Sequence, residues 1–392
     1  MSAAARQRGF AFDPALVGAV LGLAVIGMIM VSSSSVAIGD QRTGDPLYYL
    51  YQHLGAFAIG AVGLVLAASI PLQLWYRSSW IMLFGGLGLL ALVLIPGFGR
   101  AVNGSVRWLE LGPLGFQASE PARLLLIMYI ASYSVRHNRD LSSSFLGFLK
   151  PMLIVSIAGV LLLAEPDFGA AVVLTAASLG ILFAAGARIR DLAVVAAAAV
   201  VLLGFVAFSA AYRVDRIMSF RAPFDDPYND GFQLVQSLIA IGSGDWLGVG
   251  LGESVQKLFY LPEAHTDFVF AVLAEETGLV GSTVVIALFS LLVYRTFVIG
   301  RRAFEKELPF HGVLCTGIGI TLGIQAGINI GVNTGLLPTK GLTLPLISFG
   351  RSSTIVTLCA IGLLLRVYFE VEQAAKARSA RAASSGRRKK AK

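Results

Sequence analysis

The residues of this chain that could do chemistry gather around one short stretch, YLPEAHTDFVFAVLAEETG (residues 260–278). Several ionisable side chains stand at the start of this apolar segment or inside it: Glu263, His265, Asp267, Glu275 and Glu276. An ionisable side chain at bilayer depth costs roughly 2.5–3.5 kcal/mol on insertion scales, so such residues usually serve a function. Because carboxylates inside or beside a membrane segment are usually functional, Asp267 is our candidate for chemistry. The alternative is that Asp267 only caps the helix that starts there, next to Thr266.

The predicted helix after Thr266 has one narrow polar face. Positions 267, 271, 274, 275 and 278 share that face and are Asp, Ala, Ala, Glu and Gly. Small residues beside two carboxylates predict a cavity along the helix. At 1.5 Å per residue, the second carboxylate would lie about 12 Å deeper than the first.

Three other stretches are expected to bring charged residues of both signs toward the same side of the membrane as Asp267. They are NGSVRWLELGPLGFQASEPARL (103–124), EPDFGAA (165–171) and TGLLPTKGLTLPLISFGRSS (334–353). Their charged candidates are Arg107, Glu120, Arg123, Asp167, Lys340 and Arg351. Cations near a carboxylate suit a reaction in which a phosphate group leaves while a hydroxyl is deprotonated. Transport of an anionic lipid would fit the same residues. Glu120 and Arg123, three residues apart, could equally form a structural ion pair, and EPDFGAA could be a tight turn.

Residues 317–333 carry two rows at a spacing of four. One row consists of Gly319, Gly323, Gly327 and Gly331, and it predicts close helix packing. The other row consists of Thr321, Gln325, Asn329 and Asn333. Hydrogen bonding between helices explains this amide row as well as a water-filled groove does. The Gly- and Pro-rich segment 334–349 that follows predicts a re-entrant loop beside the site.

The elements that position these residues are membrane helices. The 392 residues are 56% hydrophobic and 14% charged, with a mean hydropathy of +0.75, which no ordinary soluble domain shows. We predict an all-α polytopic membrane protein of about ten transmembrane helices, the first retained rather than cleaved as a signal peptide. The predicted spans are 14–37, 50–70, 79–97, 119–135, 151–165, 168–186, 192–212, 266–294, 311–333 and 350–369.

The distribution of basic residues predicts the orientation. With both termini in the cytoplasm, 21 of the 31 lysine and arginine residues lie on the inner side, as the positive-inside rule requires. The chain then divides into a cytoplasmic segment 1–13, a membrane domain 14–370 and a basic tail 371–392. We expect the tail to be disordered and to contact anionic lipid headgroups rather than nucleic acid. Residues 213–265 form a long periplasmic loop between the seventh and eighth helices.

This topology bounds the chemistry. The candidate site faces outward, no P-loop is present, and nucleotide sugars stay in the cytoplasm, so nucleotide-driven reactions are excluded. No credible spacing of metal ligands is evident, although carboxylates could share Mg²⁺ with a pyrophosphate. A substrate from the outer leaflet is expected.

These stretches resemble the SEDS family (shape, elongation, division and sporulation) of bacterial cell-wall polymerases. The resemblance covers nearly the whole chain in family order, and GESVQKLFYLPEAHTDF (252–268) and LPTKGLTLP (337–345) resemble its cell-division branch. It implies a peptidoglycan glycosyltransferase of the inner membrane that links the disaccharides of lipid II into glycan strands. The expected partners are lipid II, the growing strand, a class B penicillin-binding protein and other proteins of the division septum.

The resemblance also assigns roles. It places the family's essential aspartate at Asp267, as general base toward the acceptor sugar 4-hydroxyl, with undecaprenyl pyrophosphate leaving. It implies a divalent cation, Mg²⁺ or Mn²⁺, and no nucleotide. The implied substrate-binding residues are Arg107, Glu120, Arg123, Asp167, His265, Lys340, Ser352 and Ser353. Arg123 stands where the family has lysine, and Arg351 where it has glycine, so these positions depart from the pattern.

Two other functions stay open on the residues alone. A lipid II flippase would need a polar path to the cytoplasmic side, whereas the polar groups concentrate outward. A scaffold that only positions a transpeptidase would not need the chemistry of Asp267.

Overall fold

The computed structural model describes residues 11–390 except 103–104, 112–113, 209–219, 221–222, 226 and 228–230. Its long helices are α1 (Pro14–Thr43), α2 (Tyr48–Ser69), α4 (Ser79–Val93), α5 (Ser119–Arg136), α7 (Phe145–Ala164), α8 (Phe168–Ala184), α9 (Ile189–Phe208), α12 (Val269–Glu305), α13 (Pro309–Asn333) and α14 (Arg351–Lys390). Shorter helices are α3 (Leu72–Arg77), α6 (Asn138–Ser143) and α11 (Phe232–Ser243). Each predicted span overlaps one long helix. The mainly helical, polytopic architecture is thus confirmed.

The number of membrane crossings stays a prediction. By length and composition, six of the described helices could each span a bilayer, namely α1, α2, α7, α12, α13 and α14 as far as Arg378. The helices α4 and α8 are apolar but shorter than 18 residues.

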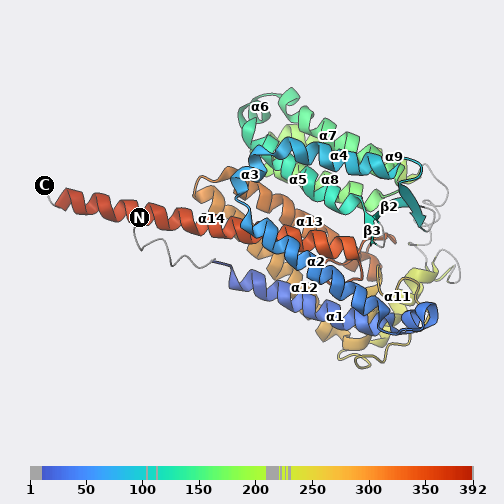
Figure 1. Cartoon of the computed structure of the whole chain (residues 1–392). Helices are drawn as coiled ribbons and strands as arrows, with labels where there is room; N and C mark the ends of the chain where they lie inside the picture. The colour runs from blue at the N-terminus through green and yellow to red at the C-terminus, as the bar shows by residue number, and fades with distance from the viewer. Residues whose placement is uncertain are drawn as a thin grey trace.

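The bundle has two halves joined by α13 (Figure 1). One half contains α1, α2, α12 and α14, and the other contains α4, α5, α7, α8 and α9, with α13 contacting both α12 and α8. The N-terminal end of α1 and the C-terminal part of α14 lie at one end, and the candidate stretches lie at the other. We call this second end the outer end.

A small sheet at the outer end was not predicted. Strands β1 (Gly99–Val102), β2 (Ser105–Leu111) and β3 (Leu114–Gln117) pair antiparallel in the order β1-β2-β3. The register places Trp108 opposite Gln117 and Leu109 opposite Phe116. Glycine and proline interrupt the apolar alternation in this segment, which hid the strands among turn signals. The sheet leads directly into α5 and therefore positions Glu120.

The expectation for the C-terminal tail needs correction. The segment 371–390 continues α14 as a helix rather than being disordered, because its Ala, Arg, Lys, Gln and Glu residues favour helix once α14 has nucleated it. The long loop 213–265 contains α11, whose apolar face packs on α12. Much of its first half, and residues 1–10 of the predicted N-terminal segment, fall outside the described residues.

The glycine row of α13 lets α12 approach closely. A methyl group at Gly319 would lie 3.1 Å from Thr296 Cγ2, and one at Gly323 would lie 3.4 Å from Val293 Cγ2. Both partners are on α12, so the predicted packing role is confirmed at these positions. Gly327 faces open space and has no such role.

Helix α12 is kinked at Gly278, and the preceding loop fills the break. Gly278 has φ 64° and ψ −162°. Beyond it, Leu279 N donates to Asp245 O at 2.9 Å and Val280 N donates to Trp246 O at 3.2 Å. The loop carbonyls thus replace the carbonyls that these two N–H groups would have bound in an unbroken helix. A methyl group at Gly278 would lie 2.4 Å from Gly248 N, so the crossing requires glycine.

We predict that Gly278→Ala destabilises the protein by roughly 1–3 kcal/mol, because alanine must adopt the left-handed backbone and also collide with the loop. Thermal unfolding in detergent micelles, followed by circular dichroism, would measure it. Gly327→Ala is the matched control and should unfold at the same or a higher temperature, since it adds helix propensity in open space. Equal melting temperatures for Gly278→Ala and the wild type would contradict the prediction.

Candidate functional site

Asp267 lies in the turn that precedes α12, and two asparagines of α13 hold it there. Asn329 Nδ2 and Asn333 Nδ2 donate to the carbonyl oxygen of Asp267 at 2.8 and 3.0 Å. Asn333 Oδ1 accepts from Ala271 N at 3.0 Å and so caps α12 from outside. The helix starts at Val269 with no side-chain cap of its own, so the capping alternative for Asp267 is wrong.

The same amide row fixes the loop 334–349. Asn329 Nδ2 also donates to Leu342 O at 2.6 Å, and Gln325 Nε2 donates to Thr343 O at 3.1 Å. Hydrogen bonding, rather than a water-filled groove, therefore explains these residues. Their bonds place the loop and the Asp267 segment against the same face of α13.

The carboxylate of Asp267 is half-buried and electrostatically crowded. It lies against Gly341, where a methyl group would come within 2.9 Å of Oδ2. Burial raises the pKa of Asp267 to about 7, with a further increase from the negative charge of Glu263, while Arg107 lowers it. Burial, which disfavours the charged form of a carboxyl group, is thus the main cause of the raised pKa. At neutral pH this group can both accept and return a proton.

Asp167 is the N-cap of α8 and is committed to hydrogen bonds. Its Oδ1 accepts from Ala170 N at 3.1 Å, and its Oδ2 accepts from Ser119 Oγ at 2.9 Å and from Gln117 Nε2 at 3.3 Å. The tight turn considered for this stretch is thus present. Asp167 also lies close enough to Asp267 to raise its pKa.

Arg107 on β2 ties the sheet to the turn between α7 and α8. Its Nε donates to Glu165 O at 3.1 Å, and its guanidinium donates to Pro166 O at 2.5 Å. The side chain of Glu165 is fully buried, and no described residue donates a hydrogen bond to either oxygen. Burial, and then the charge of Asp167, raise the pKa of Glu165 to about 8.

Glu120 and Arg123 form the ion pair considered above, inside the bundle. The Arg123 guanidinium contacts Glu120 Oε2 at 2.7 Å and also donates to Gln325 Oε1 at 2.7 Å. Both side chains are about 95% buried. They line a cavity of about 20 Å³ between α5, α13 and α14. This network links α5 to the amide row of α13.

The remaining predicted residues reach the site from three directions. Ser352 Oγ accepts from Gln117 N at 2.9 Å and joins α14 to β3, whereas Ser353 Oγ is buried with no partner among the described residues. Lys340 Nζ lies 4.7 Å from the centre of the Phe168 ring, a cation–π contact. Arg351 lies over β3, 3.4 Å from a methyl group placed at Gly115.

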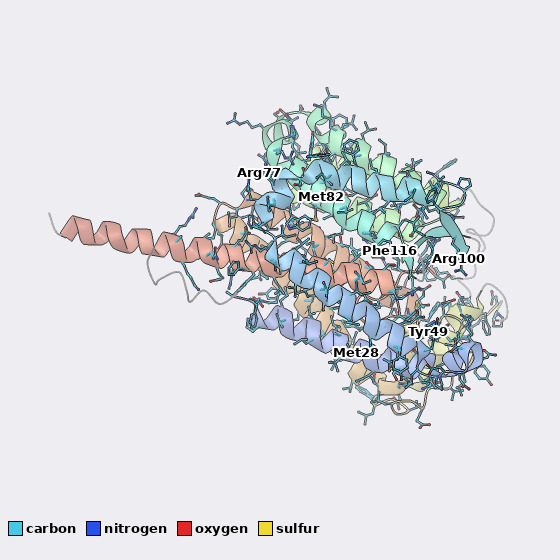
Figure 2. All side chains as sticks on the ribbon, viewed as in Figure 1. Met28, Tyr49, Arg77, Met82, Arg100 and Phe116 are labelled. Carbon is cyan, nitrogen blue, oxygen red and sulfur yellow. The ribbon has the colours of Figure 1, made fainter. Side chains whose placement is uncertain are left out.

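His265 belongs to an aromatic cluster rather than to the charged group. Its ring centre lies 4.9 Å from that of Tyr49 and 5.7 Å from that of Phe349. Its carbonyl oxygen accepts from Phe349 N at 2.9 Å. Burial lowers the pKa of His265, which keeps its ring neutral. Figure 2 shows Tyr49, like Phe116 of the sheet, toward the outer end, with Arg77 at the opposite end.

The predicted cavity along the polar face of α12 is wrong. Ala271, Ala274 and Glu275 on that face are buried, because the loop preceding α12 packs over it. Glu275 accepts from Ser254 Oγ and from Val255 N, while Glu276 forms an ion pair with Lys257 at 2.8 Å. These two carboxylates anchor the loop and do not face the site.

Sequence reasoning missed several supporting residues. Gln117 and Ser119 bind Asp167, and Gly341 makes room for the Asp267 carboxylate. The polar pair flanking Ala118, just before Glu120, was a usable signal for the first two. Nothing in the sequence placed Gly341 opposite Asp267, because that contact joins two loops.

The described residues contain no group of three His, Cys, Asp or Glu side chains that could hold a metal ion. The oxygens of Asp167 are already occupied by N–H and O–H donors. These residues do not fit a metal site made by protein ligands alone.

Comparison with known proteins decides the family, because the family model of the FtsW/RodA/SpoVE cell cycle proteins matches residues 14–373. The chain belongs to this family. The SEDS resemblance is thereby confirmed, and the FtsW/RodA/SpoVE chain described here is a multi-pass membrane protein.

Close relatives are named for the division branch. A "Probable peptidoglycan glycosyltransferase FtsW" of Thioalkalivibrio sulfidiphilus is 51% identical over 358 residues, which cover 91% of this chain and 90% of the relative. One of Nitrosococcus halophilus is 52% identical over 361 residues, covering 91% and 92%. The likeness to the division branch is therefore confirmed.

Solved structures of the family share the fold. A chain from a study titled "Structural coordination of polymerization and crosslinking by a peptidoglycan synthase complex" matches with TM-score 0.75 and 31% identity, over 93% of this chain and all of that chain. The rod shape determining protein RodA of Thermus thermophilus matches with TM-score 0.67 and 29% identity, over 91% and 97%.

We predict that Arg123→Ala destabilises the protein by about 3–5 kcal/mol, because it leaves Glu120 buried without its counter-charge. Arg123→Lys, the residue that the family usually has, should cost less, since it keeps the charge but loses one of the two hydrogen bonds. Melting temperatures of the purified variants test this order. Adding Glu120→Gln to Arg123→Ala should restore part of the loss; a double variant no more stable than the single one would contradict a buried ion pair.

Proposed function

We propose that this chain is a peptidoglycan glycosyltransferase of the FtsW type, which polymerises lipid II into glycan strands at the outer face of the cytoplasmic membrane. The observation that carries the proposal is the half-buried carboxylate of Asp267. It stands at the outer end of a membrane helix, is held by two asparagines through its carbonyl, and has a pKa of about 7. The names of the relatives support the same activity.

The proposed reaction transfers a glycosyl group between two lipid-linked sugars. Asp267 removes the proton from the 4-hydroxyl of the acceptor sugar as that oxygen attacks the anomeric carbon of the donor. The bond from this carbon to the pyrophosphate oxygen breaks, and undecaprenyl pyrophosphate leaves with both bonding electrons. The pKa of about 7 suits Asp267 to this step, because a base works best when its pKa lies near the ambient pH.

Cationic side chains around Asp267 suit the leaving group. Arg107 lies close enough to lower the pKa of Asp267, and Lys340 reaches the start of α8 at Phe168. Positive charge here would stabilise the negative charge that develops on the pyrophosphate. We assign both residues to binding the donor. Asp167, Ser352 and Ser353 are buried, so we propose that they contribute to donor binding by positioning the residues around them. The expectation of Mg²⁺ or Mn²⁺ stays a proposal, and no step is assigned to it.

Glu120, Arg123 and His265 are proposed to act indirectly. Glu120 and Arg123 are tied to Gln325, whose amide also holds the loop that carries Lys340. His265 packs that loop through Phe349. Their contribution to substrate binding is therefore to position the groups that would touch it.

The proposed setting is the division septum, with both termini in the cytoplasm. The N-terminal end of α1 and the C-terminal end of α14 both lie on the side opposite the candidate site, which supports this orientation. A class B penicillin-binding protein is the proposed partner, since a structural relative comes from a complex that coordinates polymerization and crosslinking. Other septal proteins are expected to join it.

We predict that Asp267→Asn lowers the polymerisation rate by at least 10²-fold, because the amide has the same shape but cannot accept the proton. The assay is glycan polymer formation from lipid II by the purified protein with its transpeptidase. Glu263→Gln is the matched control, since it neutralises a neighbouring exposed carboxylate and should stay active. Normal polymerisation by folded Asp267→Asn would remove Asp267 from the base role. Transfer of fluorescent lipid II across partner-free vesicles would instead favour a flippase.

The same assay has a predicted pH dependence. The base must be unprotonated, so kcat/KM should rise with pH through about 7 and level off above it. Glu263→Gln should move this rise to lower pH, because the negative charge of Glu263 raises the pKa of Asp267. A rise that stays in place in Glu263→Gln, or activity that falls with increasing pH across this range, would contradict the assignment.

A further inference from the structure

The loop that crosses the kink of α12 exposes an unusual amount of apolar side chain. In residues 245–260, which we call the crossing loop, eight large hydrophobic side chains are 45–78% exposed. They are Trp246, Leu247, Val249, Leu251, Val255, Leu258, Phe259 and Tyr260. A soluble surface rarely gathers so many in one short segment, so something apolar must cover them.

The charged residues of the crossing loop do not offset this character. Lys257 donates to Ser33 Oγ and to Glu276 Oε1, both at 2.8 Å, and only 9% of its side chain is exposed. Asp245 and Glu253 are the exposed charges. The segment is thus mainly apolar outward, with two exposed carboxylates, and is anchored inward by a buried ion pair.

Two ion pairs, each including a residue of α12, mark depth along the bundle. At the inner end, Arg295 of α12 pairs with Asp13 at the start of α1. Toward the outer end, Ser33 of α1 donates to Glu276 of α12, which also binds Lys257. Between these levels neither helix carries a charged residue. The interval is 19 or 20 residues in each helix, roughly 30 Å at 1.5 Å per residue, which equals the thickness of a hydrocarbon core.

The crossing loop begins on the hydrocarbon side of the outer boundary. Asp245 and Trp246 accept from the backbone of Leu279 and Val280, which lie three and four residues inward of Glu276. Leu279 and Val280 are themselves about half exposed on the face of a membrane helix. The exposed side chains of Trp246 and Leu247 therefore continue a surface that lipid already covers.

We propose that the crossing loop is an interfacial anchor, seated among the headgroups and upper acyl chains of the outer leaflet. Trp246 and Leu247 are its deepest side chains, about 5 Å inside the hydrocarbon boundary. Its two aromatic residues with polar atoms, Trp246 and Tyr260, are the types that favour this interface. The occupant is lipid, not a second protein, because the apolar surface is continuous with the lipid-facing side of α12.

This anchor sets the height of Asp267, the proposed base, relative to the membrane. Glu276, which holds the loop, and Val269, which follows the Asp267 turn, are seven residues apart on α12. Asp267 then stands roughly 10 Å outside the hydrocarbon boundary. If the proposed function holds, this is the level at which a lipid-linked sugar lies just beyond its pyrophosphate.

Spin labels provide the test. Leu247→Cys and Tyr260→Cys would be labelled separately in the full-length protein carrying Cys359→Ala, since Cys315 is fully buried. Each protein is reconstituted into vesicles of phosphatidylethanolamine and phosphatidylglycerol. Power saturation compares relaxation by oxygen, which concentrates in lipid, with relaxation by a water-soluble nickel chelate. Val25→Cys and Gln41→Cys, both exposed on α1, calibrate the membrane centre and the outer water.

We expect the label at position 247 to favour oxygen over nickel, with a value between those at 25 and 41, and the label at 260 to lie closer to the headgroups. Equal nickel access at 247, 260 and 41 would overturn the proposal. So would protection at 247 and 260 from both reagents, since that indicates protein cover. No activity is measured, so failure of the anchor and failure of the polymerase assignment give separate results.

Discussion

Three amide side chains on α13 hold together the Asp267 turn, the 334–349 loop and the start of α12. Gln325, Asn329 and Asn333 donate to backbone carbonyls of the 334–349 loop and of Asp267, and Asn333 also caps α12. The carbonyls belong to irregular backbone next to membrane helices, where an unpaired polar group is costly. Each bond therefore both stabilises the fold and restricts where Asp267 stands. The glycines on the other face of α13 let α12 lie close enough for these contacts.

Five acidic residues of the outer end divide into two groups by their partners. Glu120 and Glu276 each have a cation, and Asp167 and Glu275 accept several hydrogen bonds. The negative charge of these four residues is therefore stabilised by contacts within the protein. Asp267 is held through its main chain instead, which leaves its carboxylate available and raises its pKa by burial. This difference in partners separates Asp267 from those four acids. Glu165 also lacks a donor among the described residues, but its side chain is fully buried, whereas that of Asp267 is partly exposed.

Features that depend on residues close together in the sequence could be predicted, whereas contacts between distant segments could not. Helices and their order depend on apolar runs about 20 residues long, so every predicted span overlaps a helix, and the spacing of four on α13 correctly predicted packing at Gly319 and Gly323. The cavity beside Ala271 and Glu275 was wrong, because periodicity along one helix gives no information about a loop that folds back over it. The contact between Gly341 and Asp267 was missed for the same reason. The sheet at 99–117 depends on pairing across turns that contain glycine and proline. Because these residues are typical of loops, the local sequence pattern did not predict strands there.

The kink at Gly278 connects the bilayer to the candidate site. Because the crossing loop donates to the carbonyls of Glu275 and Glu276 and accepts from Leu279 and Val280, it spans the break on both sides. The loop is thereby hydrogen-bonded to the first part of α12, which begins two residues after Asp267. A straight helix would need no loop to bond its backbone across a break. Its depth in the membrane would follow only from the length of its own apolar segment. Here the depth of the acid is set by a loop whose outward face is apolar, so the same element that seats the protein in the leaflet also fixes the level at which a proton can be taken.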